Sequence, residues 1–261
     1  KTRLDAELVR RGLARSREIA SDLIEDRLVL IAGIPATKAA TQVDAETSIT
    51  LKVQGNKYVS RGGFKLNGAL DHFSELDVKD KVVLDAGAST GGFTDVLLRR
   101  GAKLIYAVDV GYGQLAWEIQ SNPKVKVLDR LNIRNISLQL IDQPVDLIVA
   151  DLSFISLKLV LPALKSVSKP DTDYLLMVKP QFEVGKERLG EGGVVRESGL
   201  RKSAVLEVAN AAFSIGLGCL GVVASQLPGP SGNVEYFLWL KENAPALLEV
   251  DLDNAISQGP Q

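Results

Sequence analysis

Residues 81–93 read Lys-Val-Val-Leu-Asp-Ala-Gly-Ala-Ser-Thr-Gly-Gly-Phe, and they give the strongest local signal of the fold. Its apolar start, at residues 82–84, is rich in the β-branched side chains that buried strands prefer. Gly87 and Gly91 allow the backbone to turn tightly and to come close to a bound ligand. Helical spacing resumes after Phe93, so the stretch predicts a strand, a tight turn and a helix.

Similar apolar runs follow along the chain and alternate with helical stretches. The apolar runs are residues 82–87, 104–110, 125–128, 145–152 and 173–179. Continuous Val, Ile and Leu runs of this kind are typical of parallel strands that are covered on both faces. The last two runs, 218–227 and 233–240, are separated only by Pro-Gly-Pro-Ser-Gly, which is too short for a crossover helix. We therefore predict a Rossmann-like α/β sheet that ends in an antiparallel hairpin at its edge.

The first 54 residues follow a different pattern, with two short helices before β-rich pieces. Leu4 and Leu8 share a helical face, and Ser16 is a good N-cap for the second helix. Gly33 and a turn at Gly55-Asn56 interrupt the β-rich part. The expected organisation is a small α+β domain at 1–54, a linker at 55–63, an α/β domain at 64–242 and a C-terminal tail at 243–261.

Composition places the chain among ordinary globular proteins, with 46% hydrophobic and 24% charged residues in 261. The single cysteine, Cys219, excludes an internal disulfide, and the single histidine, His72, excludes a metal site built from several imidazoles. Acidic metal sites remain open, but no spacing points to one, so no metal is expected. Residues 1–65 carry 12 Lys and Arg against 8 Asp and Glu, whereas the remainder carries 19 against 24. This asymmetry indicates either a polyanionic partner for the first segment or chance.

Neither the start of the chain nor its apolar runs indicate a membrane protein. The sequence opens with charged residues, without the apolar core of a signal peptide. The longest apolar stretch, at 147–164, is interrupted by Asp151, two serines and Lys158, so it does not predict a transmembrane helix. We expect a cytoplasmic protein.

A nucleoside cofactor is indicated by the loop together with Asp109, which ends the next strand, where a carboxylate can accept both ribose hydroxyls. Ser89 stands where a dinucleotide fingerprint needs its second glycine, which admits a pyrophosphate. Asp85, at the head of the loop, suits a cofactor with an ammonium group. These residues favour S-adenosylmethionine over NAD, and a turn without any ligand is the third alternative. Asp129 either contacts the adenine or caps a helix.

Three apolar runs carry charged residues: Asp151 and Lys179 end their runs, and Glu235 lies in the final hairpin strand. The carboxyl ends of parallel strands meet at one crevice, so such residues are candidates for function, although each alone is also explained as a solvated strand end. Lys65 precedes the first strand and would have to fold back over the crevice. Lysines flanked by carboxylates suit methylation of a sugar hydroxyl, which must be positioned and must lose its proton. Two other methyl acceptors fit less well. An exocyclic amine would favour a D/N-P-P-Y motif after the fourth strand, where this chain has Asp-Leu-Ser-Phe. C5 of a pyrimidine would need a cysteine nucleophile, and Cys219 lies away from the site.

These motifs resemble known families. The Lys65, Asp151, Lys179 and Glu235 set resembles the K-D-K-E tetrad of FtsJ/RrmJ-like ribose 2′-O-methyltransferases, and residues 3–33 resemble an S4 RNA-binding domain. Both in this order resemble the TlyA family of ribosomal RNA cytidine 2′-O-methyltransferases, many of which are labelled hemolysins. Further matching strings are found at 60–66, 84–98, 151–157 and 178–183. The resemblance covers roughly residues 1–240.

Carried over residue by residue, the resemblance implies a function for each motif. It implies S-adenosylmethionine as cofactor and ribosomal RNA or ribosomal subunits as partner, with the four charged residues as the catalytic tetrad. The cofactor would be lined by Gly87, Ser89, Thr90, Gly91, Asp109 and Asp129, together with Asp85. Phosphate contacts would come from Arg3, Arg17 and Lys38, each of which is also explained as a solvated basic side chain. Separately from the resemblance, the short link between the domains carries Arg61, and we hypothesise that Arg61 contacts RNA and couples RNA docking to the cofactor site.

Two departures and two alternatives accompany the resemblance. Asp26-Arg27 and Ala32-Gly33 stand where S4 domains usually have a glycine and an Asn-Gly turn, so the hairpin differs in sequence. The glycine-rich segment 182–197 is either a mobile loop near the site or an ordinary solvated loop. The competing functions are an inactive RNA-binding protein, disfavoured by the complete tetrad, and a membrane-acting hemolysin, disfavoured by the buried parallel sheet.

Overall fold

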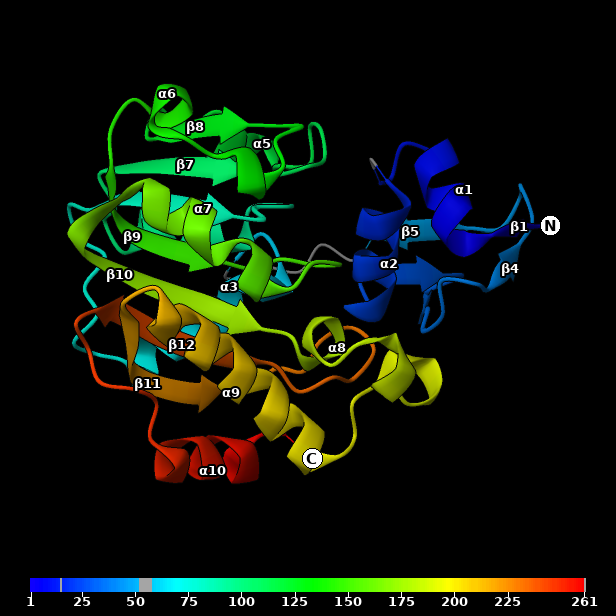
Figure 1. Cartoon of the computed structure of the whole chain (residues 1–261). Helices are drawn as coiled ribbons and strands as arrows, with labels where there is room; N and C mark the ends of the chain where they lie inside the picture. The colour runs from blue at the N-terminus through cyan, green and yellow to red at the C-terminus, as the bar shows by residue number, and fades with distance from the viewer. Residues whose placement is uncertain (15, 52–57, 261) are drawn as a thin grey trace. The chain divides into compact units, whose positions relative to one another are not determined.

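A computed structural model describes residues 1–14, 16–51 and 58–260 of the chain. The predicted turn at Gly55-Asn56 and the first part of the predicted linker lie outside these residues. The chain divides into two compact units, Lys1–Lys57 and Tyr58–Gln261 (Figure 1). Across the described ranges, no helix has the length and apolar character needed to cross a membrane.

The first unit is a small α+β domain, as the sequence predicts. Its helices α1 (Leu4–Arg10) and α2 (Arg17–Glu25) pack together, and the Ser16 hydroxyl accepts a hydrogen bond from the Ile19 N–H at 3.2 Å. Buried side chains of both helices form one core with Val29 of β2. The strands are β1 (Thr2–Arg3), β2 (Val29–Ile31), β3 (Ile34–Pro35), β4 (Gln42–Val43) and β5 (Ile49–Leu51).

Two unusual backbone positions shape this unit. Arg27 follows α2 with φ +55°, and the N–H of Leu28 donates to the carbonyl of Leu23, which is the Schellman ending normally made by glycine. Ala32 and Gly33 both have positive φ, so they form the tight turn that joins β2 to β3. The expected hairpin therefore forms even though Arg27 and Ala32 replace the usual residues.

The second unit contains a seven-stranded sheet with the order β11-β12-β10-β9-β6-β7-β8. Strands β8, β7, β6, β9 and β10 run parallel, which confirms the Rossmann-like α/β prediction. The last strand, β12, lies between β10 and β11 and runs antiparallel to both, so the predicted edge hairpin is present with β11 outermost. The strands are β6 (Val82–Ala86), β7 (Leu104–Val108), β8 (Val125–Leu128), β9 (Val145–Ala150), β10 (Ser168–Val178), β11 (Leu217–Ala224) and β12 (Tyr236–Glu242).

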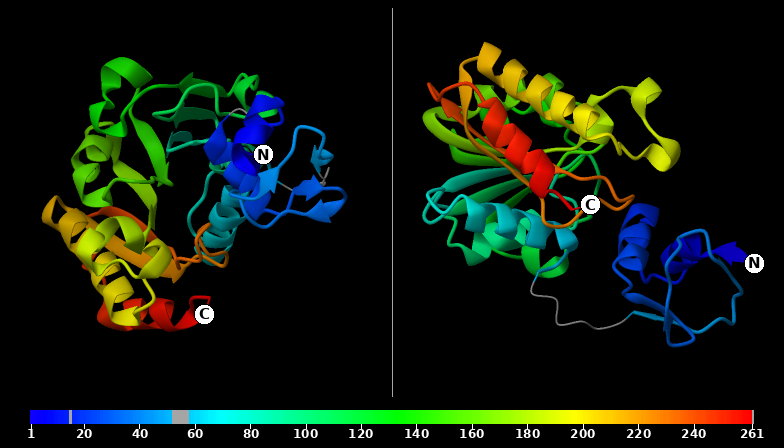
Figure 2. Two further views of the ribbon diagram at one scale, coloured as in Figure 1. Left: turned by 90° about the vertical axis from the view of Figure 1, so that its right-hand side faces the viewer. Right: turned by 90° about the horizontal axis from the view of Figure 1, so that it is seen from below.

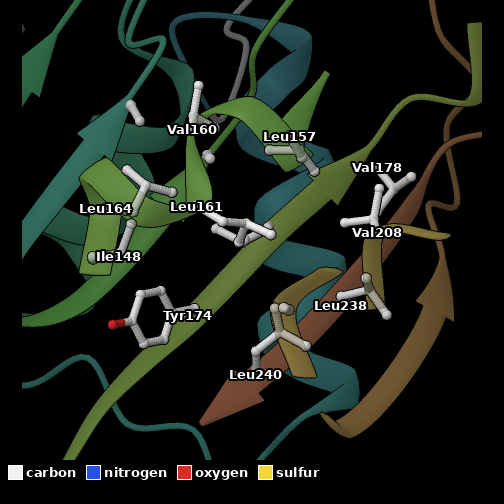
Figure 3. Packing of buried hydrophobic residues seen from close by; sticks show 14 of the residues in the cluster. Ile148, Leu157, Val160, Leu161, Leu164, Tyr174, Val178, Val208, Leu238 and Leu240 are labelled. Carbon is white, nitrogen blue, oxygen red and sulfur yellow. The ribbon is translucent and has the colours of Figure 1, made fainter. Parts of the chain in front are cut away.

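Helices cover both faces of this sheet, as buried parallel strands require. On one face, α3 (Arg61–His72) and α4 (Gly92–Arg99) pack on each other and over Val83, Leu147 and Leu175. The opposite face is covered by α7 (Leu161–Ser166), α9 (Ser198–Ser214) and α10 (Glu249–Gln258), and Figure 3 shows part of this core around Leu161 and Tyr174. Shorter helices are α5 (Trp117–Gln120), α6 (Leu138–Ile141) and α8 (Pro180–Glu183).

One helix falls within the segment where the sequence analysis predicts only a tail. Helix α10 lies beside α9 in both views of Figure 2 and buries Leu252 and Ala255 against the sheet. Burial of these apolar side chains stabilises the helix, which closes this face beside β11.

Candidate active site

The loop between β6 and α4 has the tight turn that its glycines predict. Gly87 and Gly91 have φ values of +86° and +100°, and Ser89 between them is also left-handed at +46°. A Cβ on Gly87 would lie 2.4 Å from the carbonyl oxygen of Asp151, and one on Gly91 would lie 2.9 Å from Leu115. Both glycines are thus needed for close packing against the protein itself as well as for the turn.

Asp85 lies beneath this loop and is completely buried. The Thr94 hydroxyl donates to Oδ2 of Asp85 at 2.6 Å, and Oδ1 has no hydrogen-bond partner among the described residues. Burial, together with the negative charges of Asp151 and Asp109, raises the pKa of Asp85 from 3.8 to about 7. A buried, half-satisfied carboxyl of this kind indicates a group that meets a ligand.

Asp109 and Asp129 are fixed by backbone N–H groups of the loops after β6 and β7. Asp109 accepts hydrogen bonds from the N–H of Ser89 at 2.8 Å and of Gly111 at 2.7 Å, one on each oxygen. Each carboxylate oxygen keeps a further lone pair for a hydroxyl. Asp129 accepts from the N–H of Gly113 at 2.9 Å. Asn132, rather than Asp129, caps the following helical turn, so the helix-cap alternative for Asp129 is wrong.

The charge around the loop fits the cofactor that the sequence predicts. Asp85, Asp109 and Asp151 interact electrostatically, so the loop carries a concentration of negative charge. A pyrophosphate would be repelled there, whereas a sulfonium and an ammonium group would be attracted. The unpartnered Oδ1 of Asp85 adds a free acceptor at the same place. The residues present are therefore suited to S-adenosylmethionine.

Two predicted catalytic residues, Asp151 and Lys179, meet at the carboxyl edge of the sheet. Asp151 directly follows β9, and Lys179 directly follows β10. Nζ of Lys179 lies 2.6 Å from Oδ1 of Asp151 and donates to the Ser153 hydroxyl at 3.0 Å. Both side chains keep part of their surface accessible, so this ion pair can meet a substrate.

The other two, Lys65 and Glu235, form a second ion pair, with Nζ of Lys65 2.6 Å from Oε2 of Glu235. Lys65 belongs to helix α3, which packs beside α4, so the helix carries it to the crevice. Glu235 stands just before β12 rather than within the hairpin strand that the sequence predicts. Because β12 is antiparallel and pairs Tyr236 with Val178, its start lies at the edge where the parallel strands end.

Burial of the Lys65–Glu235 pair is informative in itself. The side chains are 7% and 0% exposed. Taking both charges out of water costs several kcal/mol per ion, and apolar residues of similar volume are often at least as stable. The pair therefore gives the fold little stability. Because it lies at the edge that carries Asp151 and Lys179, we infer that it has a functional role.

Three further residues at this edge are not among the site residues that the sequence predicts. Thr94 holds Asp85, and Ser153 holds Lys179. Phe154 is 88% exposed with φ +63°, and its ring lies 5.1 Å from that of Phe182. The available signal was the spacing, because each phenylalanine stands three positions after a predicted catalytic residue.

Two of the predicted RNA contacts in the first unit, Arg3 and Arg17, meet at one carboxylate. Asp5 forms ion pairs with Arg3 at 3.0 Å and with Arg17 at 2.8 Å, and these guanidinium groups hold its pKa well below the ordinary value. Lys38 is exposed beside Ala39, whose carbonyl accepts the N–H of Asp5. The Arg3 and Arg17 side chains thus meet at Asp5, and Lys38 lies nearby along the chain.

The fourth predicted RNA contact, Arg61, lies in the second unit at the start of α3. Its Nη2 donates to the carbonyl of Pro228 at 3.1 Å, in the turn before β12. For metals, the part of the chain that the structure describes holds no group of three or more His, Cys, Asp or Glu side chains arranged as ligands.

Comparison with known proteins identifies the family. Residues 58–242 match the sequence model of the FtsJ-like methyltransferases, and residues 2–49 match that of the S4 domain. The 16S/23S rRNA (cytidine-2′-O)-methyltransferase TlyA of Mycobacterium tuberculosis is 53% identical, covering 100% of this chain and 99% of that protein. The 23S rRNA (cytidine-2′-O)-methyltransferase TlyA of Campylobacter jejuni is 32% identical, with coverage of 90% and 98%.

A solved structure from Streptococcus thermophilus, whose name includes the word hemolysin, is 36% identical with a TM-score of 0.78. It covers 99% of this chain, and this chain covers 95% of it. The resemblance and the S-adenosylmethionine prediction are confirmed, and the NAD alternative is wrong. The chain therefore belongs to the TlyA group of the FtsJ-like methyltransferase family, carries an N-terminal S4 domain and uses S-adenosylmethionine.

Proposed function

We propose that this enzyme methylates the ribose 2′-hydroxyl of a cytidine in ribosomal RNA, acting on RNA or ribosomal subunits in the cytoplasm. Both TlyA relatives are named for this reaction, and 23S rRNA is common to their names. The observation that carries the proposal is the meeting of the Asp151–Lys179 pair with the acidic loop around Asp85. An activated methyl donor and a proton-accepting pair are the two requirements for methylating a weakly acidic hydroxyl.

S-adenosylmethionine supplies a methyl group that is already activated, so the protein has to position the acceptor oxygen and take its proton. We assign Lys179 to the acceptor oxygen, with Asp151 2.6 Å away as the carboxylate that receives the released proton. The Lys65–Glu235 pair orients the ribose from the other side of the crevice. Asp85, Gly87, Ser89, Thr90, Gly91, Asp109 and Asp129 form the cofactor site in this proposal.

RNA recognition is assigned to two surfaces. Arg3 and Arg17 suit phosphate contacts because their guanidinium groups meet at Asp5, and the exposed Lys38 is assigned the same role. The exposed Phe154 ring beside the Asp151–Lys179 pair suits stacking against an unpaired base. Arg61 is assigned to the RNA-facing start of α3. In the proposed domain limits, the S4 domain occupies 1–54 and the catalytic domain 64–242.

The decisive experiment treats separated ribosomal subunits with the enzyme and labelled S-adenosylmethionine, followed by alkaline cleavage of the RNA. A methylated 2′-hydroxyl cannot attack the neighbouring phosphate, so the modified linkage survives. We expect one protected cytidine in 23S rRNA, and the small subunit tested alone shows whether 16S rRNA is a second target. Labelled methyl on a base, with the linkage still cleaved, would contradict the proposal.

The catalytic assignment is tested with Lys179→Ala. Its activity should fall at least about 10³-fold while RNA and cofactor affinities stay within about twofold, because it loses the group at the reacting oxygen. Lys126→Ala is the matched control. Nζ of Lys126 also lies 2.6 Å from a carboxylate oxygen, that of Asp142, but Lys126 does not lie at the ends of β9 and β10 that carry Asp151 and Lys179. Full activity of Lys179→Ala would remove Lys179 from the mechanism.

A further inference from the structure

We propose that Asn233 is a positioning residue for methyl transfer. Its side chain connects the turn that carries Glu235 to residues 185–195 of the glycine-rich segment 182–197. The inference rests on the role proposed above for Glu235, and it assigns a task to a side chain that does not meet the substrate itself.

Asn233 is 3% exposed, and its side-chain amide makes two hydrogen bonds in opposite senses. Its Oδ1 accepts from the N–H of Val195 at 2.9 Å, and its Nδ2 donates to the carbonyl of Gly193 at 3.1 Å. Asparagine offers an acceptor and a donor at the end of a short, stiff side chain. Alanine can make neither bond, and aspartate can make only the first.

The glycine-rich segment depends on this attachment for its place. Gly192 and Gly193 have φ values of +76° and +75°, and the N–H of Gly190 donates to the carbonyl of Val194 at 3.2 Å. A Cβ on Gly190 would lie 2.7 Å from that same carbonyl oxygen. These contacts fold the turn upon itself, so they shape it without fixing it to the sheet. Asn233 provides that connection, together with the burial of Val195.

On its other side, Asn233 belongs to the turn that encloses Glu235. The carbonyl of Asn233 accepts the N–H of Gly229 at 2.8 Å, and the carbonyl of Glu235 accepts the N–H of Ser225 at 2.8 Å. A Cβ on Gly229 would lie 2.6 Å from Oε1 of Glu235, so this turn packs directly on the carboxylate. Arg61 holds the same turn at Pro228.

The position of the Glu235 carboxylate is therefore set by the turn, and the turn is held by Asn233 and Arg61. Loss of the Asn233 amide leaves the Val195 N–H and the Gly193 carbonyl without their partners. The two segments would then separate or rearrange, and Glu235 would shift relative to Lys65. A displacement of about 1 Å in a catalytic group can slow a reaction about 10²-fold.

The test compares Asn233→Ala, Glu235→Gln and the double variant in single-turnover methylation of ribosomal subunits with enzyme in excess. We expect Asn233→Ala to slow the reaction about 10²-fold with S-adenosylmethionine affinity unchanged within about threefold. In the Glu235→Gln background the same change should slow it less than about threefold, because a residue that acts through Glu235 has no further effect once Glu235 is removed. Asn132→Ala, which removes another backbone-capping asparagine, should have no effect.

Each result separates the two ideas. Suppose that Glu235→Gln reacts slowly. If Asn233→Ala then slows the Glu235→Gln variant by the same factor as it slows wild type, or does not slow wild type at all, the positioning role is wrong and the proposed tetrad stands. If Glu235→Gln reacts at the normal rate, the proposed role of Glu235 is wrong, and the inference fails with it. Should Asn233→Ala fold poorly, Asn233→Asp keeps the acceptor and the size, and a normal rate in that variant likewise overturns the proposal.

Discussion

The fold strongly alters the acid–base chemistry of Asp85. Its carboxyl has a pKa raised to about 7 by burial and by two neighbouring carboxylates. A cationic cofactor would favour the ionised form, so cofactor binding and deprotonation of Asp85 should be coupled.

The first prediction concerns cofactor affinity. The Kd for S-adenosylmethionine should rise roughly tenfold from pH 8 to pH 6, because protonation with a pKa near 7 competes with binding. Asp85→Asn should bind weakly with a much smaller dependence on pH, and it also corrects for titration of the cofactor itself. Calorimetric titration measures both. A wild-type protein whose affinity changes no more than that of the variant would contradict the coupling.

The second prediction concerns the protein without cofactor. The pKa of Asp85 is about 7 in the folded protein and near 3.8 when it is exposed, so between these values the folded state binds more protons than the unfolded state. The free energy of unfolding contributed by this group is therefore highest below pH 4 and is lost as the pH rises through 7. Urea unfolding of wild type and Asp85→Asn across pH 4–8 checks this, since the difference between the two should change between pH 4 and pH 7 and level off above pH 7.

The third prediction concerns the basic cluster of the S4 domain. Arg3→Ala and Arg17→Ala should each weaken RNA binding about equally for all sequences and reduce the slope of log K against log salt by about one. Arg10→Ala is the control, because Arg10 also pairs with a buried carboxylate, that of Glu7, at 2.6 Å. Filter binding over a range of salt concentrations measures the slopes, and an equal loss with Arg10→Ala would show a general charge effect.

At the scale of elements, the chain forms turns with residues that are not suited to them. Ala32 lies in the β2–β3 turn with φ +48°, where Asn followed by glycine is preferred. The strands on either side, and the core beneath Val29, hold this conformation in spite of its local cost. Such positions are not visible in an apolar pattern, because the pattern reports burial rather than torsion.

The fourth prediction follows from this turn. Ala32→Asn should stabilise the S4 domain by about 1 kcal/mol, since asparagine tolerates the left-handed conformation better than alanine. Ala32 is exposed, so no packing is lost. Chemical unfolding followed by hydrogen exchange in residues 16–51 measures the change. Ala45→Asn, at another exposed alanine outside the left-handed region, should give no gain.

At the scale of the whole molecule, each unit carries its own hydrophobic core. Leu4 and Leu8 belong to a cluster confined to the first unit, whereas the sheet of the second unit has separate clusters on its two faces. Stability in one unit should therefore be separable from stability in the other.

The fifth prediction uses this separation. Leu8→Ala should destabilise the first unit by about 2–5 kcal/mol, which is enough to unfold a domain of this size. Cofactor affinity of the second unit should be unchanged, while methylation of ribosomal subunits should be lost with RNA binding. Hydrogen exchange resolved by peptide, with cofactor titration on the same sample, checks both. Loss of cofactor binding would show that the units depend on each other.

Much of this architecture could be predicted from local pattern. The apolar runs predict each strand of the parallel sheet, and the short Pro-Gly-Pro-Ser-Gly connection predicts the antiparallel end. Helix α10 was missed although Leu252, Ala255 and Ile256 have helical spacing, because a short amphipathic segment forms a helix only when a surface is present to bury it. The apolar pattern also does not predict that β12 lies between β10 and β11, since either hairpin strand could have paired with β10.

The layered α/β fold and the cofactor loop follow from the sequence alone, because apolar runs and turn residues are local features of the chain. The charged residues at the strand ends follow as well, because parallel strands end at one edge of the sheet. Tertiary structure alone decided which charges pair. Lys65 reaches Glu235 across 170 positions because α3 packs on α4 and β12 runs antiparallel. It also decided the burial of Asp85 and the attachment made by Asn233. Such pairings depend on how distant surfaces pack, and no local spacing encodes that.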